Sequence, residues 1–180
     1  MKKIIISLTL IVSTILLVGC SKPEGTTTNS TPNNTPVVAD DGIVSVNLIP
    51  GADKAAVSEL VNIAVNLNTG PAAVNSLKLV LNYPKDLLSF DSVSTSDTNF
   101  TMWMEKEGKD GTVTLVAGEP NPGVQNNEAK VAMISFKALK EGTAKVSLST
   151  IDSSTYTSEE TNRIKKSGHQ DASVEIIAKQ

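Results

Sequence analysis

Few side chains in this sequence are of the types that carry out catalysis. The 180 residues contain one histidine, His169, and no serine in the nucleophile-elbow pattern that would pair with it. Acidic residues lie close together in two places, namely Glu105, Glu107 and Asp110, and Glu159 with Glu160. A glycosidase needs two carboxyl groups that face each other across about 5 to 10 Å, whereas charged hairpin tips and solvated loops explain both groups here. We therefore predict that the chain is not an enzyme and that His169 lies in a solvated loop.

Metal ligands are similarly scarce. The one histidine and one cysteine provide few of the ligands that a transition-metal site needs. The polar stretch at residues 152–171 offers carboxylate and hydroxyl oxygens, which calcium prefers, but it lacks the EF-hand pattern. We predict that the chain has no cofactor, with a structural calcium ion in this stretch as the alternative.

Residues 1–19 have the layout of a lipoprotein signal peptide. Lys2 and Lys3 precede an apolar run at residues 4–18, which is too short to span a bilayer comfortably. The run closes in Leu17-Val18-Gly19-Cys20, which resembles the lipobox of bacterial lipoproteins. The resemblance implies cleavage before Cys20 and lipid on its sulfur and its new amino group. We expect a chain anchored outside the cytoplasm, in the cell membrane or an outer membrane.

Composition divides the remainder into a tether and a domain. Residues 20–41 are rich in Ser, Thr, Asn and Pro, so they predict a flexible linker. Residues 42–180 suit one domain with its own core. Because the net charge is −3 and the pI is about 5.2, the basic footprint of a nucleic-acid-binding protein is missing.

From residue 43 onward, apolar and polar residues alternate with the period of half-buried strands. The pattern predicts nine short strands and no helix, with residues 52–60 as a loop. The predicted inward positions are Val44, Val46, Leu48; Val61, Ile63, Val65, Leu67; Leu77, Leu79, Leu81, Tyr83; Leu88, Phe90, Val93; Phe100, Met102, Met104; Val113, Leu115, Ala117; Ala132, Ile134, Phe136; Ala144, Val146, Leu148; and a last strand near residues 173–178. The fold class is therefore an antiparallel β-sandwich.

The order and spacing of these stretches resemble the cohesin modules of bacterial cellulosomes. The matching blocks are VSVNLIPG, VNIAVNLN, SLKLVLNYPKDLLSFDSVS, NFTMWMEKEGKDGTVTLVAG, VAMISFKAL, GTAKVSLS, STYTSEETNRI and SVEII. The resemblance implies a nine-stranded jelly roll whose partners are dockerin modules of enzymes. It also implies that the partner contacts one face, formed by the third, fifth, sixth and eighth strands.

On this sequence those strands correspond to residues 75–83, 99–105, 112–117 and 143–149. Alternation turns the following residues of that face outward: Lys78, Val80, Asn82, Asn99, Thr101, Trp103, Glu105, Thr112, Thr114, Val116, Thr143, Lys145, Ser147 and Ser149. The candidate binding residues among them are Lys78, Val80, Asn82, Thr101, Trp103, Thr114, Val116, Lys145 and Ser147. Val80, Trp103 and Val116 are predicted to form an apolar patch with Trp103 as a binding hot spot. The alternative is that Trp103 covers a sheet edge or packs under the loop at residues 118–127.

These features predict a lipid-anchored module that holds a partner protein, of the dockerin type and related to polysaccharide degradation, at the cell envelope. A carbohydrate-binding lipoprotein is the second hypothesis. Sugar-binding sandwiches stack pyranose rings on rows of aromatic side chains, and only Trp103 and Tyr156 are free to do so here. A spacer or adhesin subunit is the third hypothesis.

Overall fold

A computed structural model describes residues 42–179, which form eleven strands. The strands are β1 (Ser45–Pro50), β2 (Lys54–Ala56), β3 (Leu60–Asn68), β4 (Ser76–Asn82), β5 (Leu88–Ser94), β6 (Met102–Lys109), β7 (Thr112–Gly118), β8 (Ala129–Ala138), β9 (Gly142–Leu148), β10 (Ser154–Tyr156) and β11 (Ala172–Ile177). The predicted signal segment, Cys20 and the linker lie outside the described residues. Within residues 42–179 there is no helix of a length and apolarity that would cross a membrane.

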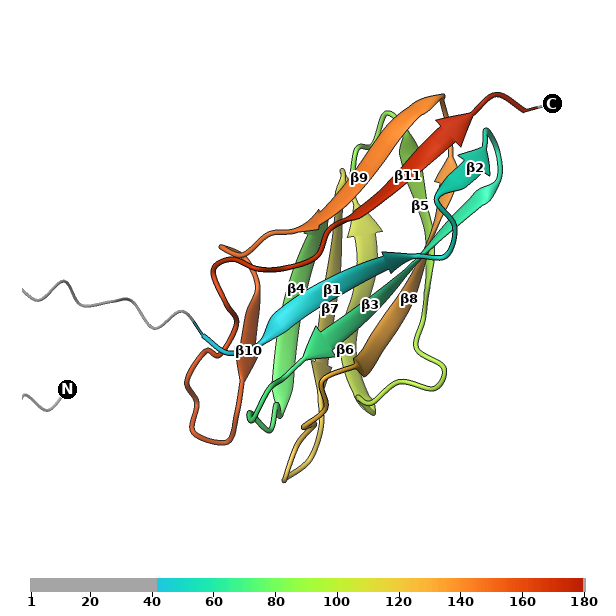
Figure 1. Cartoon of the computed structure of the whole chain (residues 1–180). Helices are drawn as coiled ribbons and strands as arrows, with labels where there is room; N and C mark the ends of the chain where they lie inside the picture. Colours follow the sequence, from blue (N-terminus) through green and yellow to red (C-terminus); the bar gives the residue numbers. More distant parts are fainter. Residues whose placement is uncertain (1–41, 180) are drawn as a thin grey trace, which may run out of the picture. The chain divides into compact units, whose positions relative to one another are not determined.

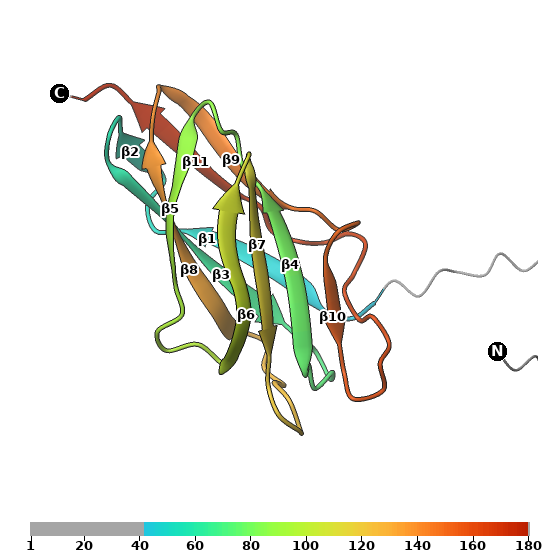
Figure 2. The ribbon, with the colours of Figure 1, turned by 180° about the vertical axis from the view of Figure 1, so that it is seen from behind.

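The strands form two sheets that pack face to face (Figures 1 and 2). One sheet has the order β1-β3-β8-β5, and the other has the order β2-β11-β9-β4-β7-β6, with β10 paired to β4. All strand pairs are antiparallel except β2 with β11. This is the predicted β-sandwich, with the jelly-roll architecture of cohesins.

The core lies between the two sheets and is built from the alternating apolar positions. In β1, β3, β7 and β11 every second residue is buried, because neighbouring side chains of a strand point to opposite faces. Phe136 on β8 is fully buried, with ring centroids 4.9 Å from Tyr83 and 6.4 Å from Phe90. The inward positions predicted for β1, β3, β7 and β8 are confirmed, and β11 forms the predicted last strand.

Two strands were missed by the nine-strand prediction. β2 lies within the stretch expected to be a loop, and β10 lies within the polar stretch at residues 152–171. Three residues are too few for a recognisable alternation, so both depend on pairing with a longer strand. In β2, Lys54 Nζ lies 2.7 Å from Glu175 Oε2 of β11. This hydrogen bond, together with the charge of the carboxylate, raises the pKa of Lys54.

The β6–β7 hairpin closes through a two-residue turn. Asp110 and Gly111 both have positive φ, 53° and 87°, which is the conformation that matches the twist of the two flanking strands. Gly108, just before the turn, lies against the ring of Phe90 on β5. The hairpin is therefore fixed at its tip and against the edge of the other sheet.

Candidate functional site

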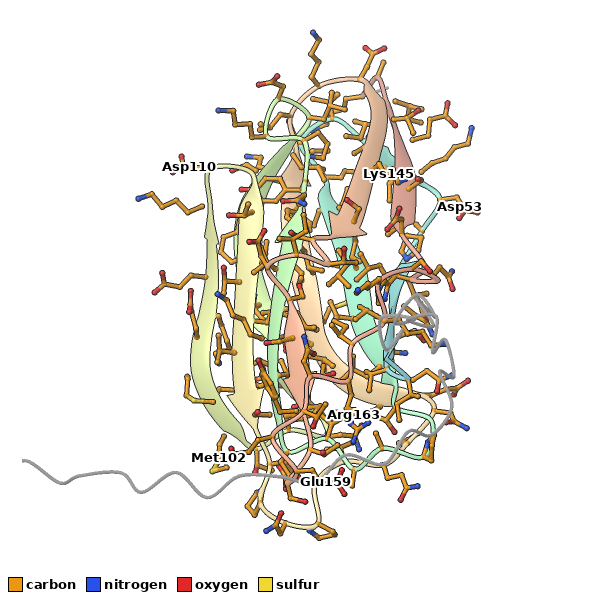
Figure 3. All side chains as sticks on the ribbon, turned by 90° about the vertical axis from the view of Figure 1, so that its left-hand side faces the viewer. Asp53, Met102, Asp110, Lys145, Glu159 and Arg163 are labelled. Atoms are coloured by element: carbon orange, nitrogen blue, oxygen red, sulfur yellow. The ribbon has the colours of Figure 1, made fainter. Side chains whose placement is uncertain are left out.

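The four strands that the cohesin resemblance assigns to a binding face lie side by side in one sheet. Their order is β9-β4-β7-β6, with β4 and β7 paired along their whole length. The edge of β4 that faces away from β7 is shared, because β9 pairs with its end at Leu81 and Asn82 and β10 with its start. Figure 3 looks onto this sheet, with Met102 at one end of β6, Asp110 at the other and Lys145 on β9. We call its outer surface the β4/β7 face.

Most predicted residues of β4, β7 and β9 point outward on this face. Lys78 is exposed and lies between Val116 on β7 and Ser154 on β10. Asn82 is exposed between Thr112 and Ser147.

Two further predicted residues of the β4/β7 face are also placed outward. Thr114 is half-buried and pairs with Val80 on one side and Glu107 on the other. Lys145 is exposed, and its Nζ lies 2.8 Å from Asp171 Oδ2. Together with the residues above, they form a mixed polar surface across β9, β4 and β7.

The orientation predicted for Trp103 is wrong. Trp103 is half-buried against the core, and its Nε1 donates a hydrogen bond to the carbonyl of Phe100 at 3.0 Å. The Lys106 ammonium lies 5.9 Å from the ring centroid, within the range of a cation–π contact. The physical reason is a register shift between Trp103 and Glu105, which inserts Met104 as an extra residue and reverses the alternation on either side.

Val80 is also unavailable as part of an apolar patch. Its side chain is only 9% exposed, although the pleat directs it away from the core. The segment that follows β9 runs alongside Val80: Ser153 Oγ accepts from the Val80 amide at 2.9 Å, and the Ser149 amide donates to the Val80 carbonyl at 2.8 Å. The patch of Val80, Trp103 and Val116 therefore does not form.

The exposed apolar residues of this face are instead Met102 and Met104. They are 50% and 65% exposed, and their methyl groups lie near Gly118 of β7. A Cβ atom at Gly118 would be 3.3 Å from Met102 Cε and 3.7 Å from Met104 Cε, so the absent side chain leaves room for both. In sequence, the charged run Glu105 to Glu107 breaks the alternation, and this was the available signal of a bulge.

Two mapped residues that precede β6 have local structural roles. The amide and hydroxyl of Thr101 both donate to Glu119 Oε2, at 2.8 and 2.7 Å. Asn99 Oδ1 accepts from the Lys130 amide of β8 at 2.7 Å, so Asn99 is hydrogen-bonded to the other sheet. Thr101 thus joins β6 to the end of β7, outside the β4/β7 face.

His169 is a structural residue, whereas a solvated loop position was predicted. It is half-buried; its Nδ1 accepts from the Val46 amide of β1 at 2.9 Å, and its Nε2 lies 2.9 Å from the Lys165 carbonyl. This network fits the tautomer protonated at Nε2. The imidazole thereby takes the place of a strand carbonyl along β1.

The acidic groups are likewise arranged for structure. Glu159 binds Arg163 at 2.8 Å, and Asp110 occupies the hairpin turn. Glu105 and Glu107 belong to β6, opposite Val116 and Thr114. Among residues 42–179 there is no group of three or more His, Cys, Asp or Glu side chains that would hold a metal ion.

Comparison with known proteins identifies the family. The cohesin domain family matches residues 46–176. A cohesin module from a family 33 glycoside hydrolase of Clostridium perfringens ATCC13124 superposes with a TM-score of 0.64 at 10% identity, covering 77% of this chain and 99% of that one. The cohesin–dockerin complex Coh-OlpC-Doc435 of Clostridium thermocellum gives 0.62 at 15% identity, covering 77% and 96%.

A non-cellulosomal cohesin of the archaeon Archaeoglobus fulgidus gives a TM-score of 0.59 at 14% identity, covering 74% of this chain and 92% of that one. These identities are low, so the solved structures show the fold alone. No curated protein sequence matches the chain. The family match extends across most of the described domain, from β1 to β11. The chain therefore belongs to the cohesin family.

Proposed function

We propose that this chain is a membrane-tethered module whose β4/β7 face binds a dockerin-type protein. The observation that carries the proposal is the exposed pair Met102 and Met104 beside Gly118. Covering apolar surface of this kind contributes about 25 cal/mol per Å² to binding, and methionine side chains adapt readily to a partner. The polar residues around the pair supply the hydrogen-bonding rim of a protein interface.

The family supports this direction. Cohesin domains are non-catalytic protein-binding modules, so the prediction that the chain is not an enzyme is confirmed by its family. The C. thermocellum relative was solved as a complex with a dockerin. A second cohesin, CaCohA2, was also solved in a complex with a dockerin.

The tether gives this binding its place in the cell. Lipid on Cys20 and the linker at residues 20–41 hold the domain outside the cytoplasm, and a bound enzyme of polysaccharide breakdown is retained there with it. The lipobox-like end of the apolar run and the composition of the linker support this arrangement.

The test uses this chain to capture proteins from the secreted fraction of the source organism, with and without a calcium chelator. Dockerins carry paired calcium-loop repeats, so the captured protein should contain such repeats, dissociate in EDTA and rebind when calcium is restored. Circular dichroism of this chain alone should not change in EDTA. Capture that is indifferent to EDTA, or of proteins without the repeats, would contradict the proposal.

A further inference from the structure

A hollow opens on the outer face of the four-stranded sheet, where the loop between β5 and β6 lies beside β8. Its volume is about 250 Å³. The lining combines apolar side chains with polar ones and includes Ala64, Asn66, Asp97, Lys130, Ala132 and Met133. β3 and β8 belong to the sheet opposite the β4/β7 face, so this hollow is separate from the proposed protein-binding surface.

The floor of the hollow follows from the pairing of β3 with β8. Ala64 lies opposite Met133, and Asn66 lies opposite Lys130, with a register shift between Val65 and Asn66. The side chain of Ala64 is short, so it leaves a depression that the longer side chains of Met133, Asn66 and Lys130 border. The apolar floor is therefore set by strands and does not depend on a mobile loop.

The rim is held in place by the loop's own hydrogen bonds. The Asn99 amide donates to the Lys130 carbonyl at 2.8 Å, and the Lys130 amide donates to Asn99 Oδ1 at 2.7 Å. Thr98 Oγ1 lies 3.1 Å from the carbonyls of both Thr95 and Phe100. Asp97, between these anchors, has a φ of 58°. The backbone that carries Asp97 is therefore fixed on both sides.

The polar side chains at the rim are not used within the domain. Across residues 42–179, the side chains of Asn66, Asp97 and Lys130 make no hydrogen bond or ion pair with another residue. Unpaired donors and acceptors that surround an apolar floor are the features of a small-ligand site. A carboxylate, an amide and an ammonium group together suit a ligand whose groups both donate and accept, as vicinal hydroxyls do.

We propose that this hollow binds one neutral pyranose unit of a saccharide. The sugar's C–H face would lie on Ala64 and Met133, and its hydroxyls would hydrogen-bond to Asn66, Asp97 and Lys130. The module would then hold a protein on one sheet and a glycan on the other.

The experiment is an NMR titration of the purified, ¹⁵N-labelled chain with cellobiose, xylobiose and mannobiose, and with glycine as a zwitterionic probe. At least one disaccharide should give saturable amide shifts at residues 64–66, 96–98 and 130–133. Asp97→Gly removes the carboxylate and tolerates the positive φ, and it should weaken binding about tenfold or more. Asp110→Gly is the matched control, because Asp110 is also exposed with a φ of 53°, and it should change the affinity by less than about twofold.

Three outcomes would overturn the proposal. They are the absence of saturable shifts with all three sugars, shifts from glycine alone, and equal weakening by the two variants. Because none of these readouts involves a protein partner, a failure here is distinguishable from a failure of the dockerin proposal.

Discussion

At the scale of single residues, Gly108 sets how closely β6 approaches the edge of the other sheet. A Cβ atom at this position would lie 2.1 Å from Cγ of Phe90, well inside van der Waals contact. Phe90 in turn packs edge-on against Phe136 in the core. The absence of a side chain at residue 108 thus allows β6 to close over the Phe90 ring.

Gly108→Ala should therefore destabilise the domain by about 1 to 3 kcal/mol, the usual cost of overpacking. The measurement is urea unfolding of the purified chain. Gly51→Ala is the matched control, because an added Cβ there meets its nearest atom, the Asn62 carbonyl oxygen, at 3.4 Å. The control should change the free energy of unfolding by less than about 0.5 kcal/mol. Equal losses for the two variants would contradict the close approach to Phe90.

The orientation of Trp103 on β6 is the part of the site that could not be predicted from the sequence. The alternation in Met102-Trp103-Met104 is compatible with two opposite orientations of the strand. Either the two methionines or the tryptophan point inward. Because of the bulge at Met104, the tryptophan points inward and the methionines point outward. The bulge depends on how β6 pairs with β7, and this pairing cannot be read from the sequence of β6 alone. The outward positions of Lys78, Asn82 and Val116 were predictable because β4 and β7 pair without a shift.

At the scale of elements, the long strands were predictable and the short ones were not. β3 and β8 have nine and ten residues, so their alternation identifies the buried face without knowledge of their neighbours. β2 and β10 have three residues each and are strands only because β11 and β4 lie beside them. Their detection needs the tertiary fold.

The burial of Phe136 on β8 predicts a large loss of stability when this side chain is truncated. Phe136 is 0% exposed and contacts two aromatic rings. Phe136→Ala should cost about 3 to 5 kcal/mol, because it removes a large side chain and leaves a cavity. Urea unfolding of the purified chain measures this loss. A cost below about 1 kcal/mol would mean that β8 does not carry the centre of the core.

At the scale of the whole molecule, the two sheets present different outer faces. One carries the exposed methionines of β6, and the other carries the hollow beside Asp97. The first described residues and residue 179 lie at opposite ends of the sandwich (Figure 1). The chain therefore enters the described domain at one end of the sandwich and leaves it at the other (Figure 1).

The proposed lipid anchor belongs to this scale because it would set where the module acts. Cys20→Ala should abolish lipid attachment, since acyl transfer to this position requires the thiol. Cells would be labelled with a palmitate analogue and fractionated. Wild-type chain should carry the label in the membrane fraction. Label retained on the Cys20→Ala chain would rule out Cys20 as the anchor.

The measurement closest to the central claim is the affinity of the chain for a captured dockerin-bearing protein, determined by calorimetry for three forms. The double variant Met102→Ala/Met104→Ala should bind about tenfold or more weakly than wild type, because both truncated side chains belong to the proposed interface. Met133→Ala is the control, since Met133 is 40% exposed on the opposite sheet, and it should bind within about twofold of wild type. Unchanged affinity of the double variant, or an equal loss with Met133→Ala, would contradict docking on the β4/β7 face.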